Sequence, residues 1–197
     1  MHISKNECRK LKDDELVRRS LQNVEYFACL FERYEKKLIY YILRISSFSP
    51  EEADDVLQEA FLKIWKNLNK FDSSLKFSSW AYRIVHNTAM SNWRKSRSYG
   101  KNQHINIDDE LFKNMLPGND FVEELHKGNI DLEIRKILNG IPKNYSDVLV
   151  LKFLEEKKYN EISDILKKPV GTVATLIHRA KKAFRKEADK NNIIFEL

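Results

Sequence analysis

The chain has 197 residues and a formal net charge of +6, with 42% hydrophobic and 32% charged residues. It is long enough for one ordinary domain or two small ones, each with a modest core. No apolar run reaches membrane-spanning length, and residues 1–15 lack the apolar block of a secretion signal, so we expect a soluble, cytoplasmic protein. Few glycines and prolines, and apolar residues that recur at intervals of three and four, predict an all-α fold.

The first predicted helices belong to an N-terminal helical bundle. One begins near Asp13 or Asp14, and another begins near Asn23, which favours a helix start. The second helix has apolar residues along one side, at Phe27, Leu30, Phe31, Tyr34, Leu38 and Ile42. Cys8 and Cys29 form no CxxC pair and have no nearby histidine set, so we expect neither a zinc site nor a disulfide framework, and Cys29 should be a small buried side chain.

The next predicted helix starts at Ser49-Pro50-Glu51-Glu52, where a serine cap is followed by a proline and by a glutamate three residues after the cap. The helix should run to about Leu68. Its outward arc surrounds one leucine with polar residues and consists of Glu51, Asp55, Gln58, Glu59, Leu62 and Lys66. An apolar residue ringed by charge is typical of a protein-docking surface, although single exposed leucines are common and usually have no function. Because residues 51–66 contain five acids and two lysines, this face would repel DNA and should bind a basic or mixed protein surface.

A polar connection, Phe71 to Lys76, leads to a helix over Phe77 to Arg97 in which cations and aromatic rings share one face. The expected core arc is Trp80, Ala81, Ile84, Val85 and Thr88, and the opposite arc is Tyr82, Arg83, His86, Met90, Trp93, Arg94 and Arg97. Single-stranded nucleic acid offers a phosphate for each cation and a flat base for each ring. The pattern is equally compatible with a solvated basic face on which Trp93 covers a neighbouring helix.

Residues 98–129 predict a flexible linker, because they are polar, contain Pro117-Gly118 and have no sustained period. The linker carries six acids against three lysines and separates two basic segments. We therefore expect a first domain over 1–97, a second small domain over 130–190, and a tail at 191–197 to which no role can be assigned.

The second domain contains a helix-turn-helix candidate. Tyr159 to Leu166 has one apolar side, Pro169 interrupts it, and a second helix follows from Gly171. That helix has an apolar stripe of Val173, Leu176, Ile177, Ala180 and Phe184, and small or hydroxyl side chains near its start on the opposite side, followed by cations. A helix that enters the major groove has this order of side chains, although short helix pairs also occur in many other folds.

Three ordered segments carry a family resemblance: DDVLQEAFLKIWKN from Asp54, FSSWAYRIVHNTAMSNWRKS from Phe77, and the run of 46 residues from Ile141 to Lys186 that contains the helix pair. The chain resembles a bacterial sigma factor of the extracytoplasmic-function type, group 4 of the housekeeping sigma factor superfamily. The resemblance implies that the clamp helices of the RNA polymerase large subunit bind Asp55, Gln58, Glu59 and Leu62.

The resemblance also implies contacts with promoter DNA. The loop from Phe71 to Lys76 would capture a flipped base of the minus-ten element, with Phe71, Ser73 and Lys76 as its contact residues. Asn87 and Arg94 match family residues that contact DNA, Arg83 is a further candidate, and Tyr82 and Trp93 are candidates for stacking on bases. The minus-thirty-five element would bind the later helix at Gly171, Thr172, Ala174, Thr175, His178, Arg179 and Lys182.

Three positions depart from the family pattern. Ser91 stands where aspartate is usual, Asp147 stands where arginine is frequent, and Ala174-Thr175-Leu176 replaces a segment that commonly has a lysine, a serine and an arginine. The last change leaves few long donors for base edges, so minus-thirty-five recognition should depend on the DNA backbone and shape.

The predicted function is therefore an RNA polymerase sigma factor that binds core polymerase, recognises promoter DNA and assists strand opening. We expect no catalytic residues, cofactor or metal, because the sequence has no phosphate-binding glycine loop, ligand cluster or nucleophile–base pair. Expected partners are core RNA polymerase, promoter DNA and an anti-sigma factor, and the free chain should be monomeric. Two alternatives remain open at this point: a helix-turn-helix regulator that acts on duplex DNA without joining polymerase, and an adaptor that binds polymerase without reading DNA.

Overall fold

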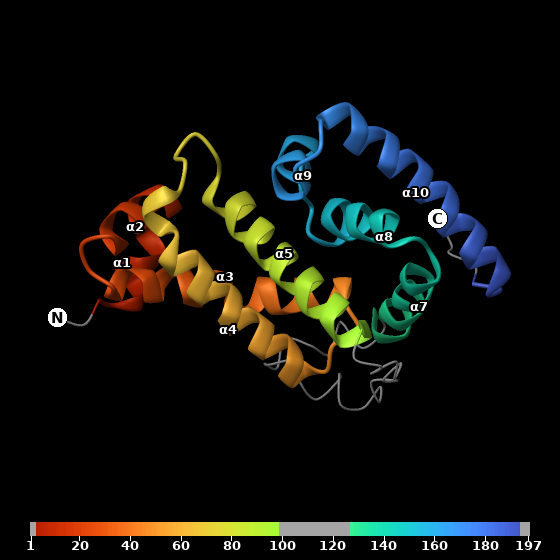
Figure 1. Ribbon diagram of the computed structural model, residues 1–197, viewed down its shortest axis with the longest axis horizontal. Coiled ribbons are helices and arrows are strands. Elements are labelled where there is room, and N and C mark those ends of the chain that lie inside the picture. The colour runs from red at the N-terminus through yellow and green to blue at the C-terminus, as the bar shows by residue number, and fades with distance from the viewer. Residues whose placement is uncertain (1–2, 99–126, 194–197) are drawn as a thin grey trace. The chain divides into compact units, whose positions relative to one another are not determined.

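The computed structural model describes residues 3–98 and 127–193, and it describes no side chains at 97–98 and 127–132. Every regular element in these ranges is helical, which confirms the predicted all-α class (Figure 1). Most of the predicted linker, residues 98–129, and part of the tail, 191–197, lie outside the described residues, so the flexibility of the linker stays a prediction.

The N-terminal half consists of α1 (Lys5–Lys10), α2 (Asp13–Ser20), α3 (Glu25–Ile45), α4 (Pro50–Lys66), the short 3₁₀ turn η1 (Leu68–Lys70) and α5 (Phe77–Ser98). The C-terminal half consists of α7 (Lys127–Gly140), α8 (Lys143–Leu149), the π-helical turn η3 (Val150–Leu154), α9 (Tyr159–Leu166) and α10 (Val170–Lys190). The chain divides into two compact units: residues 160–168, which include most of α9, group with the N-terminal half, and α7, α8, η3 and α10 form the other unit.

Helix α3 is the centre of the N-terminal bundle, since it packs against α1, α2, α4 and α5. It contributes a column of fully buried side chains that includes Leu30, Leu38, Tyr41 and Ile42. Helices α4 and α5 run side by side and bury small residues toward each other and toward α3: Ala53, Ala60, Ala81, Val85 and Ala89 (Figure 1). Small side chains let the helices approach closely, so little rotation of either helix is available and its outward face is fixed.

The expectation that the two cysteines form no disulfide is wrong. Cys8 of α1 and Cys29 of α3 are bonded, with their Cα atoms 5.4 Å apart. No sequence motif predicts this pair, because the bridge spans 21 residues and depends on the fold of α1 and α2 back along α3. Cys29 is buried, as expected.

In the second unit, α10 packs against α7 and α8 around a core that includes Ile137, Val148, Leu151, Val173 and Ile177. Lys143 and Asp147 form an ion pair one turn apart on α8, which provides a partner for the buried carboxylate at the position where the family often has arginine. None of the helices in the described ranges is both long and apolar enough to cross a membrane.

Candidate functional site

Helix α4 presents an acidic face with an exposed leucine near its middle. The helix start is fixed by a reciprocal capping box, in which the Ser49 hydroxyl accepts from the Glu52 N–H at 3.2 Å and the Glu52 carboxylate accepts from the Ser49 N–H at 2.9 Å. Because the opposite side of α4 packs into the bundle, Asp55 and Gln58 are exposed to solvent and Leu62 is 59% exposed. The predicted outward arc is therefore confirmed as a surface.

Trp65 enlarges this apolar surface and was missed in the sequence analysis. It lies three residues after Leu62 and is 38% exposed, while its ring packs on Phe27 of α3 with centroids 4.9 Å apart. Phe61 in turn packs on Phe27 and Phe31. The spacing of three from Leu62 was the available signal for a continuous exposed pair. We call Asp55, Gln58, Leu62 and Trp65 the α4 docking face.

Glu59, the fourth residue expected to bind polymerase, also has partners within the bundle. Its Oε1 lies 2.7 Å from Lys63 Nζ, and its Oε2 accepts a hydrogen bond of 2.8 Å from the Asn92 side chain of α5. Lys63 also donates to the Thr88 hydroxyl at 3.3 Å. The hydrogen bonds from Lys63 and then from Asn92 lower the pKa of Glu59, so its carboxylate stays charged. Glu59 thus connects the docking helix to the next helix.

The loop before α5 is folded against an aromatic cluster. The Phe71 ring is half-buried and lies 5.8 Å from Phe77 and 5.2 Å from Trp80, between ring centroids. Asp72 accepts from the Ser74 N–H at 2.9 Å, which closes a tight turn and lowers the pKa of Asp72. Ser73 and Lys76 are exposed at the surface of this turn. Phe71, Ser73 and Lys76 were predicted to contact DNA. The ring of Phe71 packs on Phe77 and Trp80 and so anchors the loop, while Ser73 and Lys76 lie at its surface.

The expectation that Tyr82 stacks on bases is wrong for this structure. Its side chain is 1% exposed and its ring centroid lies 5.0 Å from that of Tyr41 on α3. The same buried layer contains His86, whose Nδ1 is 2.9 Å from the Tyr41 hydroxyl, and Met90. Because α5 packs on both α3 and α4, it buries a wider arc than the single apolar stripe predicted from the sequence.

The side of α5 that remains accessible carries a narrower set of polar residues. Asn87 and Arg94 are exposed and Arg83 is half-exposed, and their spacing of four and seven residues aligns them along one side of the helix. Arg94 donates through Nε to the carbonyl of Met90 at 3.1 Å, which directs part of its guanidinium along the helix. Trp93 is half-exposed beside this row. The side chain of Arg97 lies outside the described residues. We call Arg83, Asn87, Trp93 and Arg94 the α5 polar row.

Helix α10 exposes every residue expected to contact the minus-thirty-five element. Its buried side contains Val173, Ile177 and Ala180, and its exposed side contains Gly171, Thr172, Ala174, Thr175, His178, Arg179 and Lys182. Thr175 donates its hydroxyl to the Gly171 carbonyl at 3.0 Å, so its oxygen can only accept from DNA. A Cβ built on Gly171 meets no atom within 4 Å, so the start of the helix is open to a ligand.

The turn between α9 and α10 is short and well defined. Lys167 adopts a left-handed conformation with φ of 52°, and the Lys168 N–H bonds to the Ser163 carbonyl at 3.2 Å, which terminates α9 in a Schellman motif. Pro169 then precedes the first turn of α10, where its lack of an N–H costs nothing. Such a tight connection is typical of a helix-turn-helix element.

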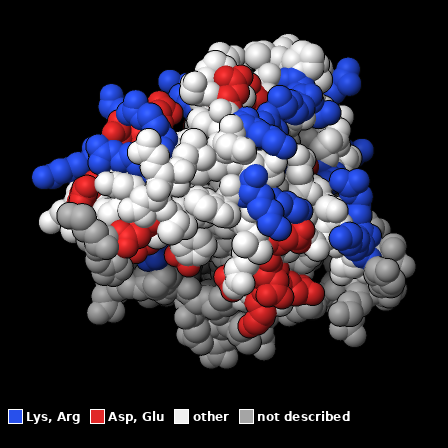
Figure 2. Space-filling model, turned by 60° about the vertical axis from the view of Figure 1, so that its left-hand side comes forward, with Lys and Arg blue, Asp and Glu red and all other residues white. Residues whose placement is uncertain are grey.

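Acidic and basic side chains both form small clusters on the face drawn in Figure 2, and the acidic clusters border basic ones. Within the described residues no group of three or more His, Cys, Asp or Glu side chains could hold a metal ion. The candidate site consists of three surfaces: the α4 docking face, the α5 polar row and the outer side of α10.

Comparisons with known proteins identify these segments. Residues 30–99 match the family model described as Sigma-70 region 2, and residues 131–184 match Sigma-70, region 4. The ECF RNA polymerase sigma factor SigW of Bacillus subtilis is 32% identical over 168 residues, which are 82% of this chain and 88% of SigW. The ECF RNA polymerase sigma-E factor of Escherichia coli K12 is 30% identical over 182 residues, which are 88% of this chain and 93% of that protein.

Two solved structures share the fold. One is CnrH in complex with the cytosolic domain of CnrY, with a TM-score of 0.64, 20% identity, and coverage of 89% of this chain and 96% of that chain. The other is the sigma factor RpoE in complex with the anti-sigma factor NepR from Bartonella quintana, with a TM-score of 0.62, 18% identity, and coverage of 83% and 96%. The sequence matches show that this chain belongs to the extracytoplasmic-function RNA polymerase sigma factors.

Proposed function

We propose that this sigma factor binds core RNA polymerase through the α4 docking face, with Glu59 at its edge. The proposal is supported by an apolar pair, Leu62 and Trp65, that lies among acidic and amide side chains on a solvated helix. Such a surface has the anatomy of an interface, in which a small apolar centre loses water and a polar rim sets orientation. The clamp helices of the large subunit, which the resemblance assigns to these positions, are the expected partner.

The α5 polar row is proposed to hold the separated strands of the minus-ten element. Arg83 and Arg94 supply charge for phosphates, Asn87 can pair with a base edge, and the half-exposed Trp93 offers the one stacking ring of the row. Ser73 and Lys76, which are exposed in the preceding loop, are proposed to contact the captured base. Unstacking a base costs a few kcal/mol, so several such contacts must act together.

The outer side of α10 is proposed to contact the minus-thirty-five element in duplex DNA. Arg179 and Lys182 follow the helix start by two and three turns, where phosphates flank the groove, and Gly171, Thr172, Ala174 and Thr175 form the base-facing end. Because that end has only short side chains, recognition should depend on close backbone approach and DNA shape.

One observation carries the proposal: two adjacent helices expose surfaces of opposite chemistry, acidic and apolar on α4 and cationic with an amide on α5. A protein that only read duplex DNA would need neither surface. The test is in vitro transcription with purified core polymerase on a library of upstream regions from the source genome. We expect promoter-dependent initiation only when both proteins are present. Binding to closed duplex without core, and no initiation on any region, would favour a helix-turn-helix regulator instead.

Three further properties belong to this proposal. The chain acts as a polymerase subunit with no catalytic activity of its own, and it works in the cytoplasm, where core polymerase and the chromosome are. A dedicated protein inhibitor is a proposed partner, and it is supported by the two structural relatives, one solved with a CnrY domain and one with the anti-sigma factor NepR.

A further inference from the structure

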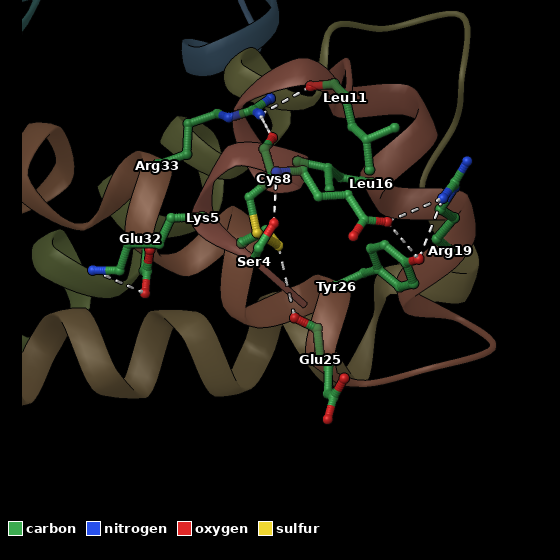
Figure 3. The surroundings of a disulfide bond; sticks show 12 residues. Ser4, Lys5, Cys8, Leu11, Leu16, Arg19, Glu25, Tyr26, Glu32 and Arg33 are labelled. Carbon is green, nitrogen blue, oxygen red and sulfur yellow. Dashed lines mark hydrogen bonds and ion pairs between the residues drawn. A yellow bond between two sulfur atoms is a disulfide. The ribbon is translucent and has the colours of Figure 1, made fainter. Parts of the chain in front are cut away.

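The N-terminal helix α1 is joined covalently to α3 by the Cys8–Cys29 disulfide (Figure 3). Helix α1 has six residues and none of them is buried. A helix this short is unstable alone, and it gains almost no apolar burial by lying on α3. Some other interaction must therefore hold it in place.

The ion pairs made by the side chains of α1 are too exposed to do so. Lys5 lies 3.9 Å from Glu32, and Glu7 lies 3.9 Å from Arg19 and 3.4 Å from the Tyr26 hydroxyl. These side chains are largely solvated, and exposed ion pairs contribute little to stability. The stronger contact is Arg33 of α3, which donates to the carbonyl oxygens of Cys8 at 2.5 Å and of Leu11 at 2.9 Å. Arg33 fixes the end of α1, and the disulfide is the one covalent connection along it.

The two cysteine residues differ in accessibility. Cys29 is 4% exposed on α3, with its Sγ 3.8 Å from the carbonyl oxygen of Glu25, whereas Cys8 is only half-buried. A thiolate from outside can therefore reach the Cys8 sulfur more readily than the Cys29 sulfur. In a cytoplasmic protein, a disulfide with one accessible sulfur is usually transient and responds to redox state.

We propose that Cys8 and Cys29 form a reversible redox modification site, in which the disulfide fixes α1 on α3 and its reduction releases α1. The biological setting rests on the proposed function, since a polymerase subunit works in a reducing compartment. Reduction requires a cellular dithiol. One of its thiolates attacks the Cys8 sulfur, a mixed disulfide forms, and Cys29 leaves as a thiolate that takes up a proton. The second thiolate of the dithiol then displaces Cys8, so two electrons pass to the protein and the dithiol becomes a disulfide.

Release of α1 uncovers the side of α3 that carries Cys29, Glu32 and Arg33. Phe27 and Phe31, whose rings pack against Phe61 and Trp65 of α4, lie on the opposite side of the helix by its 3.6-residue periodicity. The core of the bundle does not depend on α1, because the buried columns of α3, α4 and α5 contain none of its residues. Reduction should therefore loosen the N-terminus while the rest of the domain stays folded.

Hydrogen–deuterium exchange on the purified full chain, before and after dithiothreitol, tests this mechanism. In the oxidised protein we expect amides of residues 5–10 to exchange at least about tenfold more slowly than in the reduced protein. A double variant, Cys8→Ser with Cys29→Ser, should match the reduced protein under both conditions. Slow exchange in α4 and α5 provides the control that all forms are folded. Equal protection of α1 in oxidised and reduced protein would overturn the proposal.

The redox response is tested by thiol trapping with an alkylating reagent in cells of the source organism, before and after exposure to a thiol oxidant. We expect mostly alkylated cysteines in growing cells and mostly disulfide after oxidant. A pair that stays fully reduced or fully oxidised under both conditions would contradict the reversible site. Neither experiment uses promoter DNA or added polymerase, so failure here is separate from failure of the transcription test.

Discussion

The side-chain amide of Asn92 on α5 donates a hydrogen bond of 2.8 Å to Glu59 on α4 and joins the two helices proposed to bind DNA and polymerase. Asn92 also donates to the carbonyl of Thr88 at 3.1 Å, and Lys63 bonds to both Glu59 and Thr88. The four side chains form a connected polar network across the interface of α4 and α5. The network ties the edge of the docking helix to the helix that carries the α5 polar row.

Replacing Asn92 by alanine should lower the free energy of unfolding by about 1 kcal/mol, because it removes a hydrogen bond to a charged, half-buried carboxylate. Asn87→Ala is the matched control, since Asn87 is exposed on the same helix and should leave stability within about 0.5 kcal/mol. Urea unfolding measures both. If the two variants are equally stable, the contact between Asn92 and Glu59 makes no net contribution.

The same network predicts a dependence of stability on pH. Lys63 and Asn92 hold the pKa of Glu59 below the usual value of a glutamate, so the folded state favours the carboxylate. Its contribution to stability is therefore fully present above the pKa of a glutamate in the unfolded chain, about 4.3, and is lost as pH falls through the lower folded pKa. Glu59→Gln should be less stable than the wild type at pH 7, and the difference should shrink toward pH 3. Urea titrations at several pH values measure the free energy of unfolding of both proteins. A difference between them that stays constant from pH 7 to pH 3 would contradict this prediction.

Leu62→Ala should weaken binding to core polymerase by about tenfold, because it removes apolar area that the interface would bury, and about 1.4 kcal/mol corresponds to a factor of ten in affinity. Leu21→Ala is the matched control: Leu21 is 54% exposed, follows α2 and lies outside the docking face. Both variants should unfold like the wild type. Fluorescence-based titration of labelled protein with core enzyme gives the dissociation constants. Equal affinities for the two variants would remove Leu62 from the interface.

The helices of the bundle could largely be predicted from sequence, and the faces of α5 only in part. The capping box at Ser49 and the apolar spacing on α4 were sufficient to place Leu62 outside, because α4 has one broad buried side. Helix α5 packs against both α3 and α4, so Tyr82, His86 and Met90 are buried even though they lie opposite the most apolar stripe of the helix. The spacing of apolar residues along a helix shows which side of that helix is most apolar. It does not show which other helices pack against its remaining sides. The disulfide was hidden for a related reason, since it depends on the path of α1 and α2.

The correction of Tyr82 has its own consequence. Tyr82→Ala should destabilise the protein by about 3–5 kcal/mol, as is usual for loss of a buried aromatic ring. Trp93→Ala removes a half-exposed ring and should change stability far less, but it should reduce binding to forked DNA that carries single-stranded bases, when assayed with core polymerase. Thermal unfolding and DNA binding of the two variants distinguish a core role from a stacking role. A Tyr82→Ala protein that is as stable as the wild type but binds DNA weakly would show that Tyr82 contacts DNA after all.

Recognition by α10 can be resolved into phosphate contacts by salt titration. Each lost phosphate contact lowers the slope of log K against log salt by about one unit, whereas base contacts leave the slope nearly unchanged. Lys182→Ala should therefore reduce both affinity and slope on duplex DNA, with a similar loss across sequences. Lys190→Ala removes the same charge from the last turn of α10, where the helix pairs Lys190 with Glu187 at 3.4 Å, and it should change neither quantity appreciably. Because both variants lose one positive charge, equal effects would indicate that only the net charge of the domain matters, and the proposed orientation of α10 on DNA would then be wrong.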